Sequence, residues 1–286
     1  MTDAEFYLKK LLGYIHAERG IDFSRYRTAT VARKLDLMLQ ESACKDYKEY
    51  LSFLKAHPEE MQALIRTLTI KVSNFFRNPL VFELLNTTVL SELAAGFGFL
   101  KIWSIGCAYG EEPYSIAMLV HELLDQERFS CAYHIQGTDV DPYAIEKARQ
   151  GIYPAGELVE TKRRYIDAYF TKSDISPASG YGSERYLLNS EIRSMVRFTC
   201  SNIMDQLLYK RSYMGNYNLI LCRNLLIYMD LTMQEQIFRA LEDILYEDGY
   251  LVLGESETMP KSIRPDFEQP FPEVRIFRKR RSSAAH

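Results

Sequence analysis

Two adjacent acidic residues, Glu111 and Glu112, follow a loop with two glycines in the stretch KIWSIGCAYGEEPYS (101–115). Gly106 and Gly110 allow the backbone to turn sharply and to approach a ligand where a Cβ atom would obstruct it. The stretch lacks the GxGxxG spacing of dinucleotide sites, and two carboxylates at a helix start repel a pyrophosphate. The pattern therefore favours a cationic ligand without phosphate, although the glutamates could equally serve only the helix dipole.

A third carboxylate, Asp139, follows the next apolar run along the chain. In nucleoside-binding α/β sheets, an acidic residue at this place accepts hydrogen bonds from ribose hydroxyls. Asp141 precedes Pro142 and is more simply explained as a helix cap. S-adenosylmethionine combines an adenosine with a sulfonium and an α-ammonium group, so it is a ligand that suits Asp139 and the acidic helix start together.

Polar residues also follow two later apolar runs. Asn202 follows one of them, and Arg223, Asn224 and Tyr228 belong to the string CRNLLIY at the end of the other. Burying a guanidinium without a partner costs several kcal/mol, so an Arg-Asn pair closing an apolar run is hard to explain as packing. We therefore predict a functional role for this pair, and a small core residue in Cys222.

The segment KVSNFFRNP (71–79) precedes the first apolar run and contains a further candidate pair. Ser73 and Arg77 are four residues apart and would share a face of a helix. Phe75 and Phe76 are better explained by packing than by stacking on a ligand. Arg77 could instead form a surface ion pair.

The elements that must position these residues alternate after residue 99 between apolar runs and helical periodicity. Strands are predicted at 100–105, 133–138, 196–200, 217–222, 249–254 and 274–278, and helices at 113–124, 142–150 and 232–246. This alternation is typical of an α/β fold with a mostly parallel sheet, whose ligands bind beyond the carboxyl ends of the strands. Function is therefore expected in the loops after Ile105, Thr138, Cys200 and Cys222.

The parts of the chain on either side of this pattern differ from it. The first 80 or so residues show only apolar spacings of three and four, which predict a small α-helical bundle. Between 151 and 195 a charged, Tyr-rich insertion carries SDISPASGYGSERY, typical of a hairpin tip or long loop. Its flanks YIDAYF and RYLLN could pair as antiparallel strands, although helix also fits the first. We place the domains at 1–85 and 86–286, with the inserted β subdomain at about 151–195.

Composition limits the classes of function. With 35 Lys and Arg against 38 Asp and Glu in 286 residues, the formal charge of -3 gives no reason to expect nucleic-acid binding. The five cysteines form no CxxC pair, which favours reduced thiols and makes a metal site improbable. The start MTDAEFYLKK has no signal pattern, and no apolar run approaches the roughly 18 residues of a membrane span. We expect a cytoplasmic protein without membrane insertion.

Six strings of residues carry a resemblance to a known family: SNFFRNP, WSIGCAYGEEPYSIAM, GTDVDPYAIEKARQGIY, NIMD, CRNLLIYMD and LVLGESET. Their order and spacing resemble the chemotaxis-receptor methyltransferases, CheR, over nearly the whole chain. The resemblance implies an α-helical N-terminal domain, a class I methyltransferase sheet and a small inserted antiparallel β subdomain. It also implies S-adenosyl-L-methionine as the methyl donor and S-adenosyl-L-homocysteine as its product.

The resemblance implies a set of site residues as well. The cofactor pocket would be lined by Lys71, Ser73, Arg77, Gly106, Glu112, Asp139, Asn202, Ile203, Arg223 and Asn224. Arg77 and Tyr228 would act in catalysis, with Tyr228 near the methyl group and its acceptor. Two positions depart from the family motif NxTxFFR: Lys71 replaces the usual Asn and Ser73 the usual Thr. Lys71 keeps open a second hypothesis, a CheR-like regulatory module that binds cofactor without turnover.

The implied acceptor is the side-chain carboxylate of glutamates on the cytoplasmic helical bundle of a chemoreceptor. Such a carboxylate, with a pKa near 4.3, is ionised at neutral pH, so methyl transfer requires no general base. The basic segment from Arg25 to Lys34, which includes Arg27 and Arg33, could meet an acidic receptor helix or could be a solvated helix face. The β subdomain could tether the enzyme to a receptor C-terminus. A nicotinamide-dependent oxidoreductase is disfavoured by the missing GxGxxG.

Overall fold

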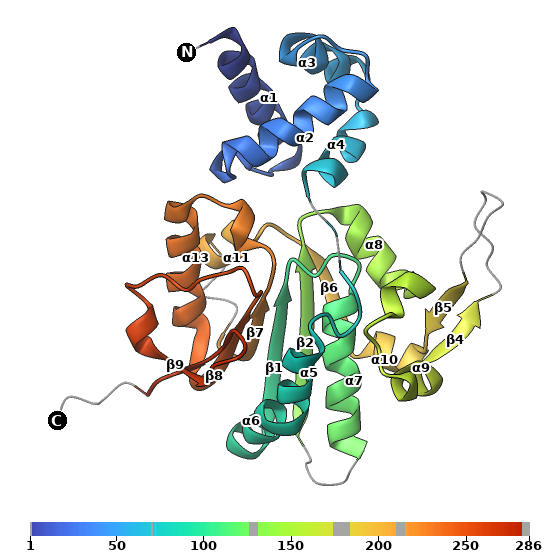
Figure 1. The fold of residues 1–286 in the computed structure, drawn as a ribbon, viewed down its shortest axis with the longest axis vertical. Helices are drawn as coiled ribbons and strands as arrows, with labels where there is room; N and C mark the ends of the chain where they lie inside the picture. The colour runs from blue at the N-terminus through green and yellow to red at the C-terminus, as the bar shows by residue number, and fades with distance from the viewer. Residues whose placement is uncertain are drawn as a thin grey trace. The chain divides into compact units, whose positions relative to one another are not determined.

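A computed structural model describes residues 2–69, 71, 73–125, 131–173, 184–209 and 215–281 (Figure 1). The chain forms two compact units. The helical unit comprises Met1–Lys71 and Leu226–Gln236, and the sheet unit comprises Val72–Leu225 and Ile237–His286. This division differs from the boundary expected at residue 85. The difference arises because the side chains of Phe75, Phe76 and Phe82 are part of the core of the sheet unit.

The helical unit contains the predicted helices α1 (Asp3–Arg19), α2 (Thr28–Glu41), α3 (Tyr47–Ala56) and α4 (Glu60–Leu68), with the short 3-10 helices η1 (Phe23–Arg25) and η4 (Leu226–Tyr228). Thr2 and Glu5 form a capping box at the start of α1, and Gly20 ends the helix with φ 70°. The spacing of the apolar residues places Leu11, Ile15, Leu35, Leu54 and Leu64 in the interior.

The sheet unit is built on a mostly parallel sheet with the strand order β6-β2-β1-β7-β8-β10-β9 among the described residues. The strands are β1 (Phe99–Ile105), β2 (Ala132–Asp139), β6 (Val196–Cys200), β7 (Tyr217–Cys222), β8 (Leu245–Leu253), β9 (Phe267–Phe271) and β10 (Ile276–Lys279). The pairs from β6 to β8 are parallel, and β10 pairs antiparallel with β8 and β9. The predicted α/β class is confirmed. The edge strand β9 was not predicted, because it contains a proline and lacks a continuous apolar run.

Helices accompany these strands (Figure 1). They are α5 (Pro79–Leu84), α6 (Leu90–Phe97), α7 (Glu111–Asp125), α8 (Pro142–Gln150), α10 (Ser190–Ser194), α11 (Ile203–Tyr209) and α13 (Leu231–Ile244), with a π-helical turn η2 (Leu85–Val89) between α5 and α6 and a 3-10 turn η5 (Arg264–Asp266). The helix α7 packs against β1, β2 and β6, and α6 packs against α7 and β1. The apolar residues of α7 therefore fill the core beneath the glycine loop.

One described helical stretch, Pro79–Phe97, is long and apolar enough to cross a membrane by length and composition alone. This corrects the expectation that no apolar run approaches that length. Its side chains Phe82, Leu85, Leu90 and Leu93 are buried in the core of the sheet unit. Core helices commonly pass such a test, so the stretch is weak evidence for a membrane span.

The insertion forms a small antiparallel sheet, as predicted, and its strand order is β3-β5-β4. Its strands are β3 (Ile152–Pro154), β4 (Phe170–Ser173) and β5 (Arg185–Leu188), and a 3-10 turn η3 (Ala155–Leu158) follows β3. The strand β3 was not predicted. The string YIDAYF is divided between the helix α9 (Arg163–Tyr169) and β4, so both interpretations of it were partly right. The predicted hairpin tip at 174–183 lies outside the described residues.

Candidate active site

The strand order places five loops in one row along the carboxyl edge of the parallel strands. These loops follow Cys200, Asp139, Ile105, Cys222 and Leu253, in the spatial order β6-β2-β1-β7-β8. The chain order reverses between β1 and β7, and such a switch point is where open α/β sheets bind ligands. We call this row of loops the crevice edge. The first four of its loops are those expected from the sequence.

Asp139 connects two of these loops through its carboxylate. Its Oδ2 atom accepts the backbone N–H of Ala108 at 3.0 Å, and Oδ1 accepts that of Asp141 at 2.9 Å. The residue is 8% exposed. A carboxylate oxygen can accept more than one hydrogen bond, which is the chemistry that a ribose hydroxyl requires of its acceptor. Asp141 accepts the N–H of Tyr143 at the start of α8, which confirms the predicted helix cap.

Arg223 and Glu112 form a buried ion pair at the crevice edge. The Nη1 atom of Arg223 lies 3.2 Å from Oε2 of Glu112, and the two side chains are 3% and 14% exposed. Oε1 of Glu112 accepts the Ser104 hydroxyl at 2.8 Å. Nη2 of Arg223 donates to the carbonyl of Arg77 at 2.9 Å and to Oδ1 of Asn78. The Arg223 guanidinium is thus buried together with a charged partner, which offsets the cost of burying it alone.

The segment 73–78 is a set of turns and not the helix that would have placed Ser73 and Arg77 on one face. Phe76 and Asn78 adopt left-handed conformations, with φ of 56° and 64°. Two bonds fix them: Phe76 N–H donates to the Ser115 hydroxyl at 3.0 Å, and Asn78 N–H donates to the Glu160 carboxylate at 2.8 Å. Helix geometry is therefore excluded here, and the half-buried Arg77 is presented by a turn.

The two loop glycines serve different purposes. Gly106 has φ 69°, and a Cβ atom there would lie 3.3 Å from Leu225, in the loop after β7. Gly110 has φ 95°, and a Cβ there would lie 2.9 Å from Ala148 and 3.0 Å from Phe198. Gly106 thus allows two loops of the crevice edge to approach each other. Gly110 is required by its positive φ, which fits the predicted sharp turn, and by core packing against Ala148 and Phe198.

The loop after β7 is bound by a carboxylate from the loop after β8. Asn224 is left-handed, with φ 57°. The side chain of Glu257 accepts the N–H groups of Asn224 and Leu225 at 3.0 and 2.9 Å. No pattern in the sequence indicated these contacts of Glu257, in the string LVLGESET, or those of Asn78 and Ser104.

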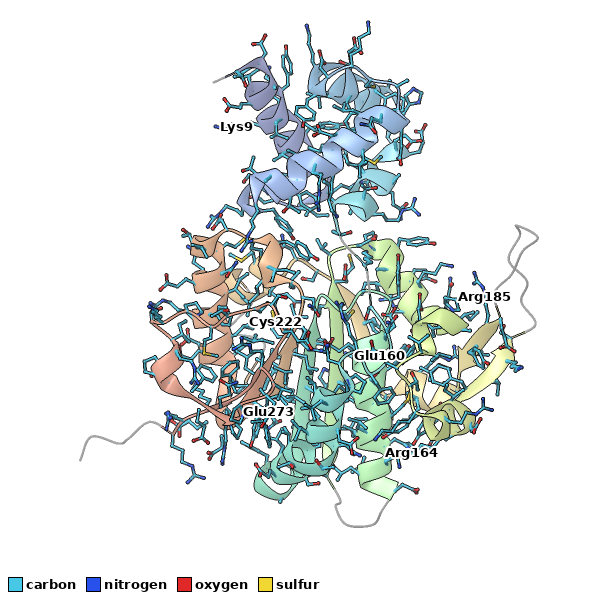
Figure 2. All side chains as sticks on the ribbon, in the orientation of Figure 1. Lys9, Glu160, Arg164, Arg185, Cys222 and Glu273 are labelled. Carbon is cyan, nitrogen blue, oxygen red and sulfur yellow. The ribbon has the colours of Figure 1, made fainter. Side chains whose placement is uncertain are left out.

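Two other predicted residues lie after β6. Oδ1 of Asn202 accepts the N–H of Met204 at 3.0 Å, so Asn202 binds the backbone of the first turn of α11. Ile203 is 8% exposed. Cys222, labelled in Figure 2, is fully buried at the end of β7, as predicted for a small core residue.

Family comparisons match nearly the whole chain. Residues 71–272 match the model described as CheR methyltransferase, SAM binding domain, and residues 7–69 match the CheR methyltransferase all-alpha domain. The chain belongs to the CheR methyltransferase family. It is therefore an S-adenosylmethionine-dependent methyltransferase.

Several methyltransferases are similar in sequence to this CheR chain. It is 30% identical to the chemotaxis protein methyltransferase of Salmonella typhimurium over 92% of this chain and 87% of the relative. It is 27% identical to that of Borreliella burgdorferi over 88% of each chain. It is also 31% identical to the probable biofilm formation methyltransferase WspC of Pseudomonas aeruginosa, over 83% of this chain and 54% of the relative.

Two predicted site residues of this CheR chain, Lys71 and Tyr228, belong to the helical unit. The carbonyl of Tyr228 accepts the N–H of Arg27 at 2.8 Å, and Asp230 N–H donates to the carbonyl of Arg25 at 2.9 Å. Residues 25–27 therefore pair with the backbone that follows CRNLL. The roles of Lys71 and Tyr228 toward cofactor and acceptor stay predictions.

The basic segment of the CheR helical unit is only partly available to a partner. Lys34 is buried, and its Nζ donates to the carbonyl of Leu68 at 3.0 Å; burial lowers the pKa of Lys34 to about 8. Nε of Arg25 lies 3.3 Å from the Asp230 carboxylate. Of the four basic residues that could meet a receptor helix or form a solvated face, only Arg27 and Arg33 are therefore exposed.

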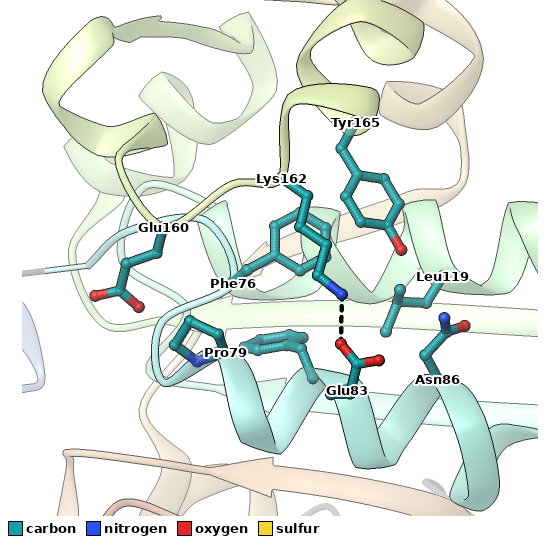
Figure 3. A pocket seen from close by; sticks show the side chains of 9 residues that line it. Phe76, Pro79, Glu83, Asn86, Leu119, Glu160, Lys162 and Tyr165 are labelled. Atoms are coloured by element: carbon teal, nitrogen blue, oxygen red, sulfur yellow. Dashed lines mark hydrogen bonds and ion pairs between the residues drawn. The ribbon is translucent and has the colours of Figure 1, made fainter.

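The CheR sheet unit also contains a small pocket (Figure 3). Phe76, Phe82 and Tyr165 contribute to its lining, and Lys162 and Glu83 form an ion pair beside it. The cavity has a volume of about 20 Å³, enough for roughly one water molecule. The pocket is too small for a nucleoside. Among the described residues, no group of His, Cys, Asp and Glu could hold a metal ion.

Glu111, the neighbour of Glu112 in the CheR glycine loop, is fully buried at the start of α7. Neither of its carboxylate oxygens has a hydrogen-bond partner of good geometry among the described residues. The pKa of Glu111 is raised to about 8, mainly by burial and also by the charge of Glu157, while backbone N–H groups and the nearby Ser73 hydroxyl offset part of the rise. The raised pKa favours the neutral form of the Glu111 carboxyl at neutral pH.

The buried Glu111 carboxyl predicts a pH-dependent stability. Between about pH 4.5 and 8 the folded protein retains a proton on Glu111 that the unfolded chain releases, so stability falls as the pH rises through this window. In Glu111→Gln, the free energy of unfolding in urea should fall less steeply with pH, by up to about 1.4 kcal/mol per pH unit. The exposed Glu273→Gln is the control. An unchanged slope in Glu111→Gln would contradict the assignment.

Proposed function

We propose that this protein transfers the methyl group of S-adenosylmethionine to glutamate side chains of chemoreceptors, giving γ-glutamyl methyl esters. The observation that carries the proposal is the match of both parts of the chain to the CheR family, whose relatives include chemotaxis protein methyltransferases. The polar residues at the crevice edge support it. Membership of this family also supports a cytoplasmic location.

The residues of the crevice edge fit the cofactor. Nε of Arg223 is buried without a hydrogen-bond partner among the described residues, so the guanidinium retains a donor beyond its pair with Glu112. We assign Arg77 and Arg223 to the cofactor's carboxylate, Glu112 to its ammonium group and Asp139 to its ribose. The remaining assignments in the pocket are Lys71, Ser73, Gly106, Asn202, Ile203 and Asn224.

The cofactor supplies an activated methyl group bonded to a positively charged sulfur. The acceptor glutamate is ionised at neutral pH, so one C–O bond forms, one C–S bond breaks and no proton is transferred. The contribution of the protein is alignment of the reacting atoms and exclusion of water from two opposite charges that neutralise each other. Tyr228 and Arg77 are assigned to orienting the methyl group and the acceptor.

The receptor is proposed to bind through the helical unit. Arg27 and Arg33 are exposed near the start of α2 and suit an acidic receptor helix. Association through these residues should weaken as salt rises. The sheet β3-β5-β4 is the proposed site for a receptor C-terminal tether, which would raise the local enzyme concentration without changing the chemistry.

A methyl-transfer assay tests the proposal. The protein, labelled S-adenosylmethionine and cytoplasmic receptor fragments should give a base-labile methyl ester on receptor glutamates. A matched fragment with those glutamates replaced by alanine should stay unlabelled. Label on another residue type would contradict the substrate assignment. If the protein binds cofactor but labels no receptor of the organism, the regulatory module is favoured. Methyl transfer by the Lys71→Asn variant would then show that Lys71 prevents turnover.

A further inference from the structure

Glu257 is a buried acid at the crevice edge, in the loop GESET after β8. It is 2% exposed. Its Oε2 atom accepts the N–H of Gly254 at 2.7 Å and that of Asn224 at 3.0 Å, and Oε1 accepts the N–H of Leu225 at 2.9 Å. Three backbone donors from two loops therefore converge on one carboxylate.

The loop that Glu257 binds has a conformation that requires support. Asn224 has φ 57°, a left-handed conformation that L-residues other than glycine adopt at an energetic cost. Consecutive N–H groups next to such a residue point into one concavity, which attracts an anion. The N–H groups of Asn224 and Leu225 form this concavity, and the Glu257 carboxylate fills it.

Gly254 shows how closely the two loops approach. A Cβ atom at Gly254 would lie 2.8 Å from the backbone nitrogen of Asn224, 2.9 Å from its side-chain nitrogen and 3.0 Å from Oε2 of Glu257. Real Cβ atoms essentially never come this close to other atoms. The loop after β8 is thus shaped around the conformation of Asn224.

The same loop sets the direction of the Arg223 side chain. Arg223 directly precedes the left-handed residue, and its guanidinium reaches Glu112 at the start of α7 and Asn78 in the segment 73–78. A change in the backbone at 224 and 225 would redirect both the guanidinium and the amide of Asn224. Glu257 itself is not exposed to the crevice, so it acts through these neighbours.

We propose that Glu257 is a positioning residue, an internal anion that fixes the Arg223–Leu225 loop in the shape required for cofactor binding. The proposal rests on the cofactor-binding role proposed above for Arg223 and Asn224. It does not depend on which receptor, or which residue of it, accepts the methyl group. Cofactor binding and methyl-ester formation can therefore be tested separately.

Calorimetry with S-adenosylhomocysteine tests this proposal. Glu257→Gln keeps one acceptor oxygen but presents an amide N–H₂ to a backbone donor, so we expect about tenfold weaker binding. With receptor fragments, KM for S-adenosylmethionine should rise by a similar factor while kcat at saturation changes less. The matched control is Glu92→Gln. Glu92 accepts the Tyr250 hydroxyl at 2.6 Å in the same unit, and its loss should lower the Tm without changing affinity.

Chemical rescue provides a second arm. Glu257→Ala leaves the concavity empty, and formate should restore affinity for S-adenosylhomocysteine, whereas chloride at equal ionic strength should not. Wild-type affinity in Glu257→Gln at a temperature where it is folded would overturn the proposal. If both Glu257→Gln and Glu92→Gln lose affinity in proportion to their loss of Tm, Glu257 only stabilises the fold and the proposal is overturned. Absence of methyl ester in the assay, with affinity responding as expected, would refute only the proposed substrate.

Discussion

Replacing Asp139 with alanine is expected to weaken S-adenosylhomocysteine binding by about 100-fold or more. Two ribose hydroxyls would lose a charged acceptor, each worth about 1.5–3 kcal/mol, and every 1.4 kcal/mol is about tenfold in affinity. The substitution also removes the acceptor for the N–H groups of Ala108 and Asp141, which connect the glycine loop to the loop after β2. Isothermal calorimetry measures the change.

Asp141→Ala is the matched control for this experiment. Asp141 is in the same loop and is also buried, but its side chain caps α8. Its loss should destabilise the protein by about 1 kcal/mol and leave affinity within about threefold of wild type. Equal affinities for Asp139→Ala and wild type would remove Asp139 from the site.

Replacing Arg223 with alanine is expected to reduce both stability and cofactor binding. The guanidinium is 3% exposed, and its removal leaves the Glu112 carboxylate and the oxygens of Arg77 and Asn78 without their partner. Breaking a buried ion pair from one side typically costs about 3–5 kcal/mol. Urea unfolding should show a loss of this size, and calorimetry should show no measurable binding of S-adenosylhomocysteine.

The double variant Arg223→Met with Glu112→Leu separates the two effects. Apolar residues of similar size often replace a buried ion pair without loss of stability. The free energy of unfolding should therefore recover in part relative to Arg223→Ala, while cofactor binding stays absent. Binding that returns together with stability would show that the pair only maintains the fold.

The sequence predicted the fold well where a pattern is local and repeated. The apolar runs and helical spacings are such patterns, and they anticipated the parallel sheet, the helical bundle and the inserted antiparallel sheet. The strand order was not predicted, but a polar residue directly after an apolar run marks a strand end wherever that strand lies. This is why Asp139 and Arg223 could be identified as candidates, and their contacts at the crevice edge support that choice.

What the sequence did not predict depends on contacts between distant segments. Asn78 meets Arg223 only because the segment around Arg77 turns through two left-handed residues, Phe76 and Asn78, and no spacing rule indicates such turns. Glu257 is next to other polar residues in GESET, and its burial becomes visible only when β8 lies beside β7. Lys34 has the sequence context of a surface residue, but it binds the carboxyl end of α4. The division at Lys71 likewise follows from tertiary packing.

A crystal structure of the complex with S-adenosylhomocysteine is the most direct test of the central claim, that the crevice edge is the cofactor site. The ribose hydroxyls are expected within hydrogen-bond distance of Asp139, and the amino-acid end of the ligand is expected at Glu112 and Arg223. A ligand bound elsewhere, with no contact to any of these three residues, would contradict the account.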